Sequence, residues 1–119
     1  MTPFGARLRA LRDARGVSLT ELAEALHVSA AYLSALEHGK RGRPSAGLIH
    51  QVNEYFGLIW DEAEEMTRLG RISHPRVVVD TAGLSPEATE LANLLARRIR
   101  DLPEGRVRAL LAALKADSG

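Results

Sequence analysis

The stretch from residue 16 to residue 39 carries two short helix patterns that lie almost back to back. Ser18 is a favourable N-cap residue, and Glu21 three positions later completes a capping box. Ser29 offers a second N-cap shortly afterwards, and Gly39 ends the second pattern. Helices this short are marginal alone, so the pair must bury its apolar sides against further helices.

The flanking sequence supplies these further helices. The apolar spacing predicts helices over residues 3–14, 46–56 and 61–69, the middle one capped by Ser45. The residues expected to face the shared interior are Phe4, Leu8, Leu11, Leu22, Ala23, Leu26, Leu33, Leu36, Leu48, Ile49, Val52 and Phe56.

The composition changes after residue 69. Residues 70–83 hold serine, proline and glycine breaks around Val77–Val79, which predicts a linker with a short extended segment. Ser85 then precedes a proline at the first position of a new helix, and apolar residues recur at helical spacing until Pro103 breaks the pattern. We therefore predict an all-α fold: a five-helix domain over residues 1–69, the linker, and two C-terminal helices over residues 84–119.

Composition excludes several functions. The formal net charge is only +1, so any attraction to nucleic acid must come from a local basic patch. Cysteine is absent, which rules out disulfides and thiol chemistry, and the four histidines show no metal-ligand spacing. No catalytic triad, glycine-rich phosphate loop or paired carboxylates stand out. We expect neither an enzyme nor a protein with a metal or cofactor.

The N-terminal residues carry four arginines and no apolar core typical of a secretion signal. No apolar run reaches the length that a membrane-spanning helix needs. From these two features we expect a soluble, cytoplasmic protein.

The order and spacing of residues 7–12, 22–26, 28–29 and 32–41 resemble the helix-turn-helix regulators of the Cro and phage-repressor type. The resemblance covers about half of the chain, and its alternative is an ordinary bundle of short helices. It implies a domain that binds double-stranded DNA by placing its second short helix in the major groove. It further implies that Arg12 and Glu37 pair and tie the first helix to that recognition helix. Two unrelated surface charges are the alternative.

The resemblance implies that residues 29–35 meet DNA, and position beside this helix adds the other expected contact residues. Together they are Ser18, Leu19, Ser29, Ala30, Ala31, Tyr32, Ser34, Ala35, His38, Lys40, Arg41 and Arg43. Alanine and serine make no bidentate contact with guanine or adenine, so specificity would depend on DNA shape or on residues outside the helix. Two positions depart from the family pattern: Leu19 replaces a common glutamine, and His27 replaces the usual turn glycine, a place that favours φ > 0.

Lys40, Arg41 and Arg43 form the densest basic cluster of the chain. Just after the recognition helix they are well placed to hold phosphates, which supply most non-specific affinity. A solvated loop without a DNA contact is the other interpretation.

The C-terminal apolar stripe is too continuous to remain in water, which predicts an interface between two copies. The expected interface residues are Val77, Val78, Val79, Leu84, Leu91, Leu95, Ile99 and Leu102. Packing of these helices against their own N-terminal domain is the alternative. Together the patterns favour a transcriptional regulator, more specifically a repressor that binds an inverted repeat as a homodimer. The alternative function is that of an antitoxin whose second half wraps a toxin.

Overall fold

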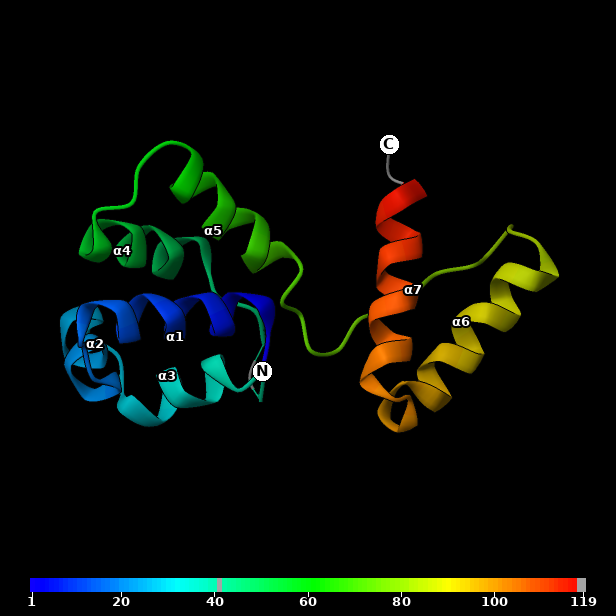
Figure 1. The fold of residues 1–119 in the computed structure, drawn as a ribbon, viewed down its shortest axis with the longest axis horizontal. Helices are drawn as coiled ribbons and strands as arrows, with labels where there is room; N and C mark the ends of the chain where they lie inside the picture. Colours follow the sequence, from blue (N-terminus) through cyan, green and yellow to red (C-terminus); the bar gives the residue numbers. More distant parts are fainter. Residues whose placement is uncertain (41, 118–119) are drawn as a thin grey trace. The chain divides into compact units, whose positions relative to one another are not determined.

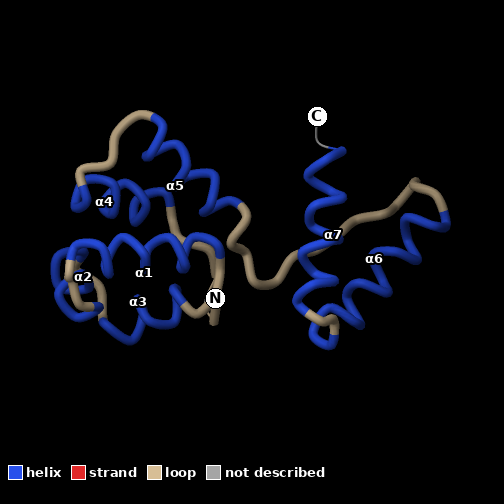
Figure 2. The backbone as a smooth tube through the Cα atoms, viewed as in Figure 1, coloured by secondary structure: helices blue, strands red, loops and turns tan. Residues whose placement is uncertain are grey.

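The computed structural model describes residues 1–40 and 42–117, and the chain divides into two compact units between Val77 and Val78. Figures 1 and 2 show that every regular element of the described residues is helical. The predicted all-α fold is therefore confirmed, with five helices before the extended segment and two after it.

The first unit contains five helices joined by short turns. They are α1 (Pro3–Arg15), α2 (Leu19–Leu26), α3 (Ala30–Glu37), α4 (Ala46–Phe56) and α5 (Asp61–Arg71). Figure 1 shows α1 in the middle of this unit, with α3 on one side of it and α5 on the other. Helix α5 continues two residues beyond its predicted end, because Gly70 is buried and packs against Ile49 of α4.

Serine N-caps start three of these helices, as predicted. The hydroxyl groups of Ser18, Ser29 and Ser45 each accept a hydrogen bond from a backbone N–H three residues later, at 3.0–3.1 Å. At Ser18 the capping box is complete, because Glu21 accepts a hydrogen bond from the Ser18 backbone N–H. These local bonds fix where each helix begins.

The predicted interior is confirmed. Phe4, Leu8, Leu22, Leu33 and Val52 are fully buried, and the rest of the predicted set is buried except Leu11, which is half-buried. Burial of side chains of this size contributes about 1.5–3 kcal/mol each, which is what holds such short helices in place.

Gly5 allows the start of α1 to touch the end of α3. A Cβ atom on Gly5 would lie only 2.2 Å from the backbone oxygen of Glu37. Since two backbones meet here, only a residue without a side chain fits. This contact was not among those predicted from the sequence.

Ser73 joins the two ends of the first unit. Its side chain is buried, accepts a hydrogen bond from the Phe4 backbone N–H at 2.8 Å, and donates to the Leu69 carbonyl. It therefore satisfies one of the free N–H groups at the start of α1 with a residue just after α5.

The second unit is a helical hairpin formed by α6 (Pro86–Arg98), the 3-10 turn η1 (Ile99–Asp101) and α7 (Glu104–Asp117). Ser85 caps α6 as predicted. Regular α-helix ends at Arg98, before the predicted end at Leu102, because Pro103 has no N–H for the carbonyl of residue 99 and its ring would clash with that carbonyl in a continued α-helix. Neither α6 nor α7 buries any of its described residues, and Val77–Val79 is exposed and unpaired.

Candidate nucleic-acid interface

The turn between α2 and α3 fixes the angle between these helices. His27 adopts the left-handed conformation, with φ 59° and ψ 41°, as its place in the turn predicted. Its backbone N–H and that of Val28 donate to carbonyls in the last turn of α2, which closes the helix end. The turn is therefore hydrogen-bonded even without the usual glycine.

Helix α3 has one buried side and one small outward side. Leu33 and Leu36 face the core, whereas Ala31 is exposed and Ser34 and Ala35 are half-buried. The outward atoms are therefore methyl and hydroxyl groups, which allow a helix to approach a groove closely but discriminate bases weakly.

Three of the predicted DNA-contact residues also pack against the interior. Leu19, Ala30 and Tyr32 are half-buried against the apolar core, so part of each side chain has a structural role. Ser18 and Ser29 use their hydroxyl oxygens as caps, which leaves their hydroxyl hydrogens available to a phosphate.

An ion pair ties α3 to α1. The Nε and Nη2 atoms of Arg12 lie 2.9 and 3.0 Å from the two carboxylate oxygens of Glu37, and Nη1 donates to the Val17 carbonyl. The Glu37 side chain is only 2% exposed and that of Arg12 11%. The hydrogen bonds that Arg12 donates to the Glu37 carboxylate raise the pKa of Arg12, so the arginine stays charged.

The basic loop after α3 is open to solvent where it is described. Lys40 and Arg43 are exposed, whereas Arg41 lies outside the described residues. His38 is also exposed, and its Nδ1 donates to the Ser34 carbonyl at 2.8 Å, so its Nε2 is left for another partner. His38, Lys40 and Arg43 therefore follow the C-terminal end of α3 as exposed residues.

A polar side chain on α4 also lies near α3. Gln51 is exposed and lines a hollow of about 430 Å³ together with Tyr32 and Ser45. A glutamine amide can make paired hydrogen bonds with adenine, which no side chain on the outward face of α3 can do. Gln51 was not among the predicted contact residues, because only the packing of α4 beside α3 brings it to this side.

The arrangement of α1 to α5 agrees with a known family. The family profile described as a helix-turn-helix domain matches residues 3–66, more than half of the chain. The chain belongs to this helix-turn-helix domain family.

Two named proteins of Bacillus subtilis (strain 168) resemble the chain. It is 42% identical over 65 residues to the HTH-type transcriptional repressor RghR, and this match covers 50% of this chain and 48% of RghR. It is 42% identical over 52 residues to the uncharacterized HTH-type transcriptional regulator RghRB, covering 44% of this chain and 37% of that protein. The chain thus spans about half or less of these relatives. No solved structure matches the chain.

None of the described helices combines the length and the apolar character that crossing a membrane requires.

Proposed function

We propose that the protein is a sequence-specific DNA-binding transcriptional regulator that acts as a repressor. The observation that carries this proposal is the capped α2–turn–α3 unit, which exposes a row of small residues beside a basic loop. Its similarity to a protein named as a transcriptional repressor supports the direction of regulation.

In this mechanism phosphate contacts position the domain and α3 reads the groove. Lys40, Arg41 and Arg43 neutralise backbone phosphates, and the free N–H groups at the starts of α2 and α3 add uncharged contacts. Ala31 and Ser34 allow α3 to enter deeply, and their lack of paired hydrogen-bonding groups leaves much of the discrimination to DNA shape.

The hairpin of α6 and α7 supports a dimer. Figure 1 shows the two helices diverging from η1, and they enclose a groove of about 220 Å³. The groove is lined by apolar and arginine side chains: Leu91, Leu94, Leu95, Arg98, Leu102, Arg106 and Leu110. A second hairpin inserted into this groove would bury leucines that one copy leaves in water.

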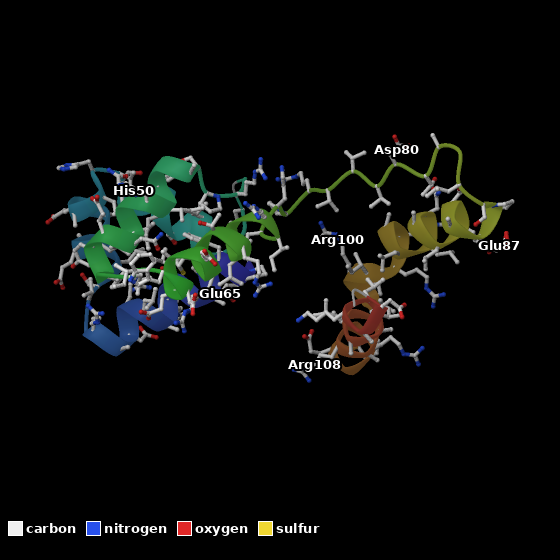
Figure 3. The ribbon with its side chains drawn as sticks, turned by 90° about the horizontal axis from the view of Figure 1, so that it is seen from above. His50, Glu65, Asp80, Glu87, Arg100 and Arg108 are labelled. Carbon is white, nitrogen blue, oxygen red and sulfur yellow. The ribbon has the colours of Figure 1, made fainter. Side chains whose placement is uncertain are left out.

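The charge pattern of α6 favours a second copy as the partner. The helix carries Glu87 in its first turn and Arg97 and Arg98 in its last turn. Figure 3 shows Glu87 and Arg100 at opposite ends of the segment formed by α6 and η1. Two copies of α6 related by a two-fold axis perpendicular to the helix run antiparallel, which brings the acidic end of one against the basic end of the other. Such a dimer would read two half-sites about 34 Å apart.

DNA selection from random duplexes tests the DNA-binding proposal. An enriched inverted repeat is the expected result. Replacing Lys40 and Arg43 with alanine should weaken binding to every sequence and flatten the dependence on salt, whereas Ala31→Arg should weaken binding to the enriched sequence most. Failure to bind any duplex at low salt contradicts the proposal.

Sedimentation tests the dimer. Leu91→Glu places a charge in the groove and should yield monomers, whereas Ile59→Glu changes an equally exposed residue (62% against 63%) of the first unit and should leave the dimer intact. A wild-type monomer at micromolar concentration contradicts it. If a different small protein instead co-purifies on the hairpin, the antitoxin function replaces the homodimer.

A further inference from the structure

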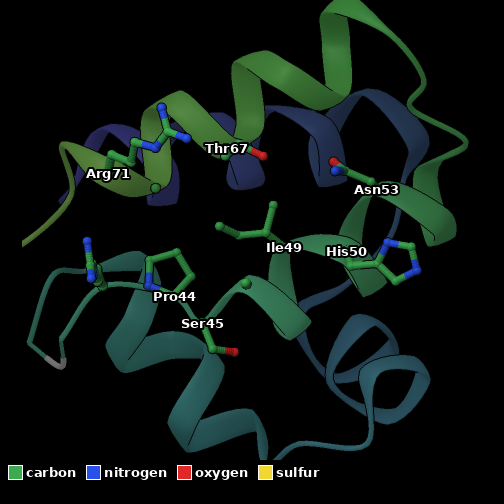
Figure 4. Close-up of a pocket in the computed structure, with 10 residues that line it drawn as sticks. Pro44, Ser45, Ile49, His50, Asn53, Thr67 and Arg71 are labelled. Atoms are coloured by element: carbon green, nitrogen blue, oxygen red, sulfur yellow. The ribbon is translucent and has the colours of Figure 1, made fainter.

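A second hollow, of about 440 Å³, lies between the first turn of α4 and the last turns of α5, and we name it the α4–α5 hollow. Figure 4 shows Ile49 between Arg71 on one side and Asn53 on the other. Pro44 and Ile49 give it an apolar floor. Gly70 lets α5 lie close to that floor, because a Cβ there would come within 2.7 Å of the Ile49 Cδ1 atom.

The charge in the hollow is positive. Arg43 and Arg71 both line it, and within the described part of the chain neither side chain makes a hydrogen bond or ion pair. None of the described lining residues is acidic. Arg68, one turn earlier on α5, is by contrast neutralised by Glu65 at 2.6 Å. Two unpaired guanidinium groups beside a small hollow are suited to a carboxylate or phosphate group.

A residue that lines the same hollow carries an unpartnered acceptor. The Oδ1 atom of Asn53 is buried and has no hydrogen-bond partner among the described residues. A buried acceptor without a donor costs free energy, so the Asn53 side chain gains a hydrogen bond by turning toward a ligand that offers a hydroxyl or amino group. The hollow thus combines a positive end, an apolar floor and an acceptor, and its volume is within the range of small-molecule sites.

We propose that the α4–α5 hollow binds a small organic anion, with a phosphate or carboxylate group at Arg43 and Arg71 and a hydrogen-bond donor at Asn53. Arg43 also belongs to the basic loop to which we assign DNA phosphates. A bound anion therefore draws Arg43 away from DNA and weakens the repressor–DNA complex. This regulatory consequence rests on the proposed function, whereas binding of the anion does not.

A titration followed by NMR tests binding without DNA. Glycerol 1-phosphate supplies both the anion and the donor, inorganic phosphate only the anion, and glycerol only the donor. Saturable shifts of the Asn53 side-chain amide and the Gly70 backbone amide are expected with glycerol 1-phosphate, weaker binding with inorganic phosphate, and no shifts with glycerol. Absence of saturable shifts overturns the proposal.

Two matched variants locate the anion. Arg71→Gln should weaken glycerol 1-phosphate binding about tenfold, since it removes a charged hydrogen bond. Arg68→Gln makes the same change on the same helix outside the hollow and should leave binding unchanged. Equal losses in both variants would mean attraction by general charge only, which overturns the assignment.

A DNA-binding measurement distinguishes the source of the anionic group. Arg71→Gln should leave the affinity for duplex DNA unchanged, while glycerol 1-phosphate should compete with DNA in the wild type and less in the variant. If Arg71→Gln weakens DNA binding as much as it weakens probe binding, the hollow holds a DNA phosphate and the small-molecule assignment is wrong. If no duplex binds while the NMR shifts persist, the proposed function fails and the anion site stands.

Discussion

Removing Arg12 should destabilise the first unit more than any exposed charge would. In Arg12→Met the apolar stem is kept, but the carboxylate of Glu37 loses both of its guanidinium hydrogen bonds while it stays 2% exposed. Breaking a buried pair in this way typically costs about 3–5 kcal/mol, because a charge remains without compensation. The hydrogen bond to the Val17 carbonyl is lost as well.

This cost is large on the scale of the domain. Stability of roughly 0.05–0.15 kcal/mol per residue gives a unit of this size only about 4–12 kcal/mol in total. Arg12→Met should therefore lose at least about a quarter of the stability of the unit at 25 °C. The double variant Arg12→Met, Glu37→Met should regain most of the loss, since two apolar side chains of similar volume need no charge partner.

Urea denaturation followed by circular dichroism measures both effects as shifts of the midpoint at constant slope. Arg7→Met is the control, because Arg7 lies on the same helix, is exposed and should change stability by less than about 0.5 kcal/mol. A loss of unfolding free energy under about 1 kcal/mol in Arg12→Met would mean that the pair contributes no more than an exposed salt bridge, which would refute this reasoning. A double variant as unstable as the single one would equally refute it.

Three further predictions concern packing and pH. Gly5→Ala should lower stability by about 1–3 kcal/mol, because the alanine Cβ would lie 2.2 Å from a backbone oxygen that can move only with α3. Thermal unfolding measures this loss, and an unchanged stability would contradict the close contact. Ser73→Ala should cost about 1–3 kcal/mol by leaving the buried Phe4 N–H without an acceptor, and amide hydrogen exchange at Phe4 should accelerate; unchanged exchange would argue against the bond. Arg68 lowers the pKa of Glu65 through their hydrogen bond, so the ion pair stabilises the folded state at neutral pH and is lost as the pH falls through that lowered pKa. The difference in Tm between the wild type and Arg68→Gln should therefore shrink on acidification. A difference that grows on acidification would contradict the assigned sign.

Local signals in the sequence were sufficient for the helix starts. Ser18, Ser29 and Ser45 cap helices through a backbone N–H only three residues away, so the pattern and the interaction lie in the same short segment. The inward residues followed in the same way from helical spacing. The left-handed conformation of His27 followed from its place in the turn.

Contacts between distant segments could not be predicted in this way. Gly5 looks like any glycine in a helix until α3 is placed against it, and Ser73 is bonded to a residue 69 positions earlier. Trp60 adopts φ 52° and is 81% exposed, and no turn residue in the sequence marks this conformation. The placement of Arg43 and Arg71 beside the same hollow likewise depends on how α4 and α5 pack.

Two contacts, one unexpected and one implied by the resemblance, meet at the end of α3, and they explain how a helix with small outward residues can serve recognition. Gly5 brings α1 against the backbone of Glu37, and Arg12 holds the side chain of the same residue. A helix that reads DNA through shape and methyl contacts must keep a fixed position, because small displacements remove short-range contacts without any strong hydrogen bond to restore them. Substitutions that loosen the end of α3 should therefore reduce sequence discrimination before they reduce phosphate-driven affinity, which depends on charge more than on exact placement.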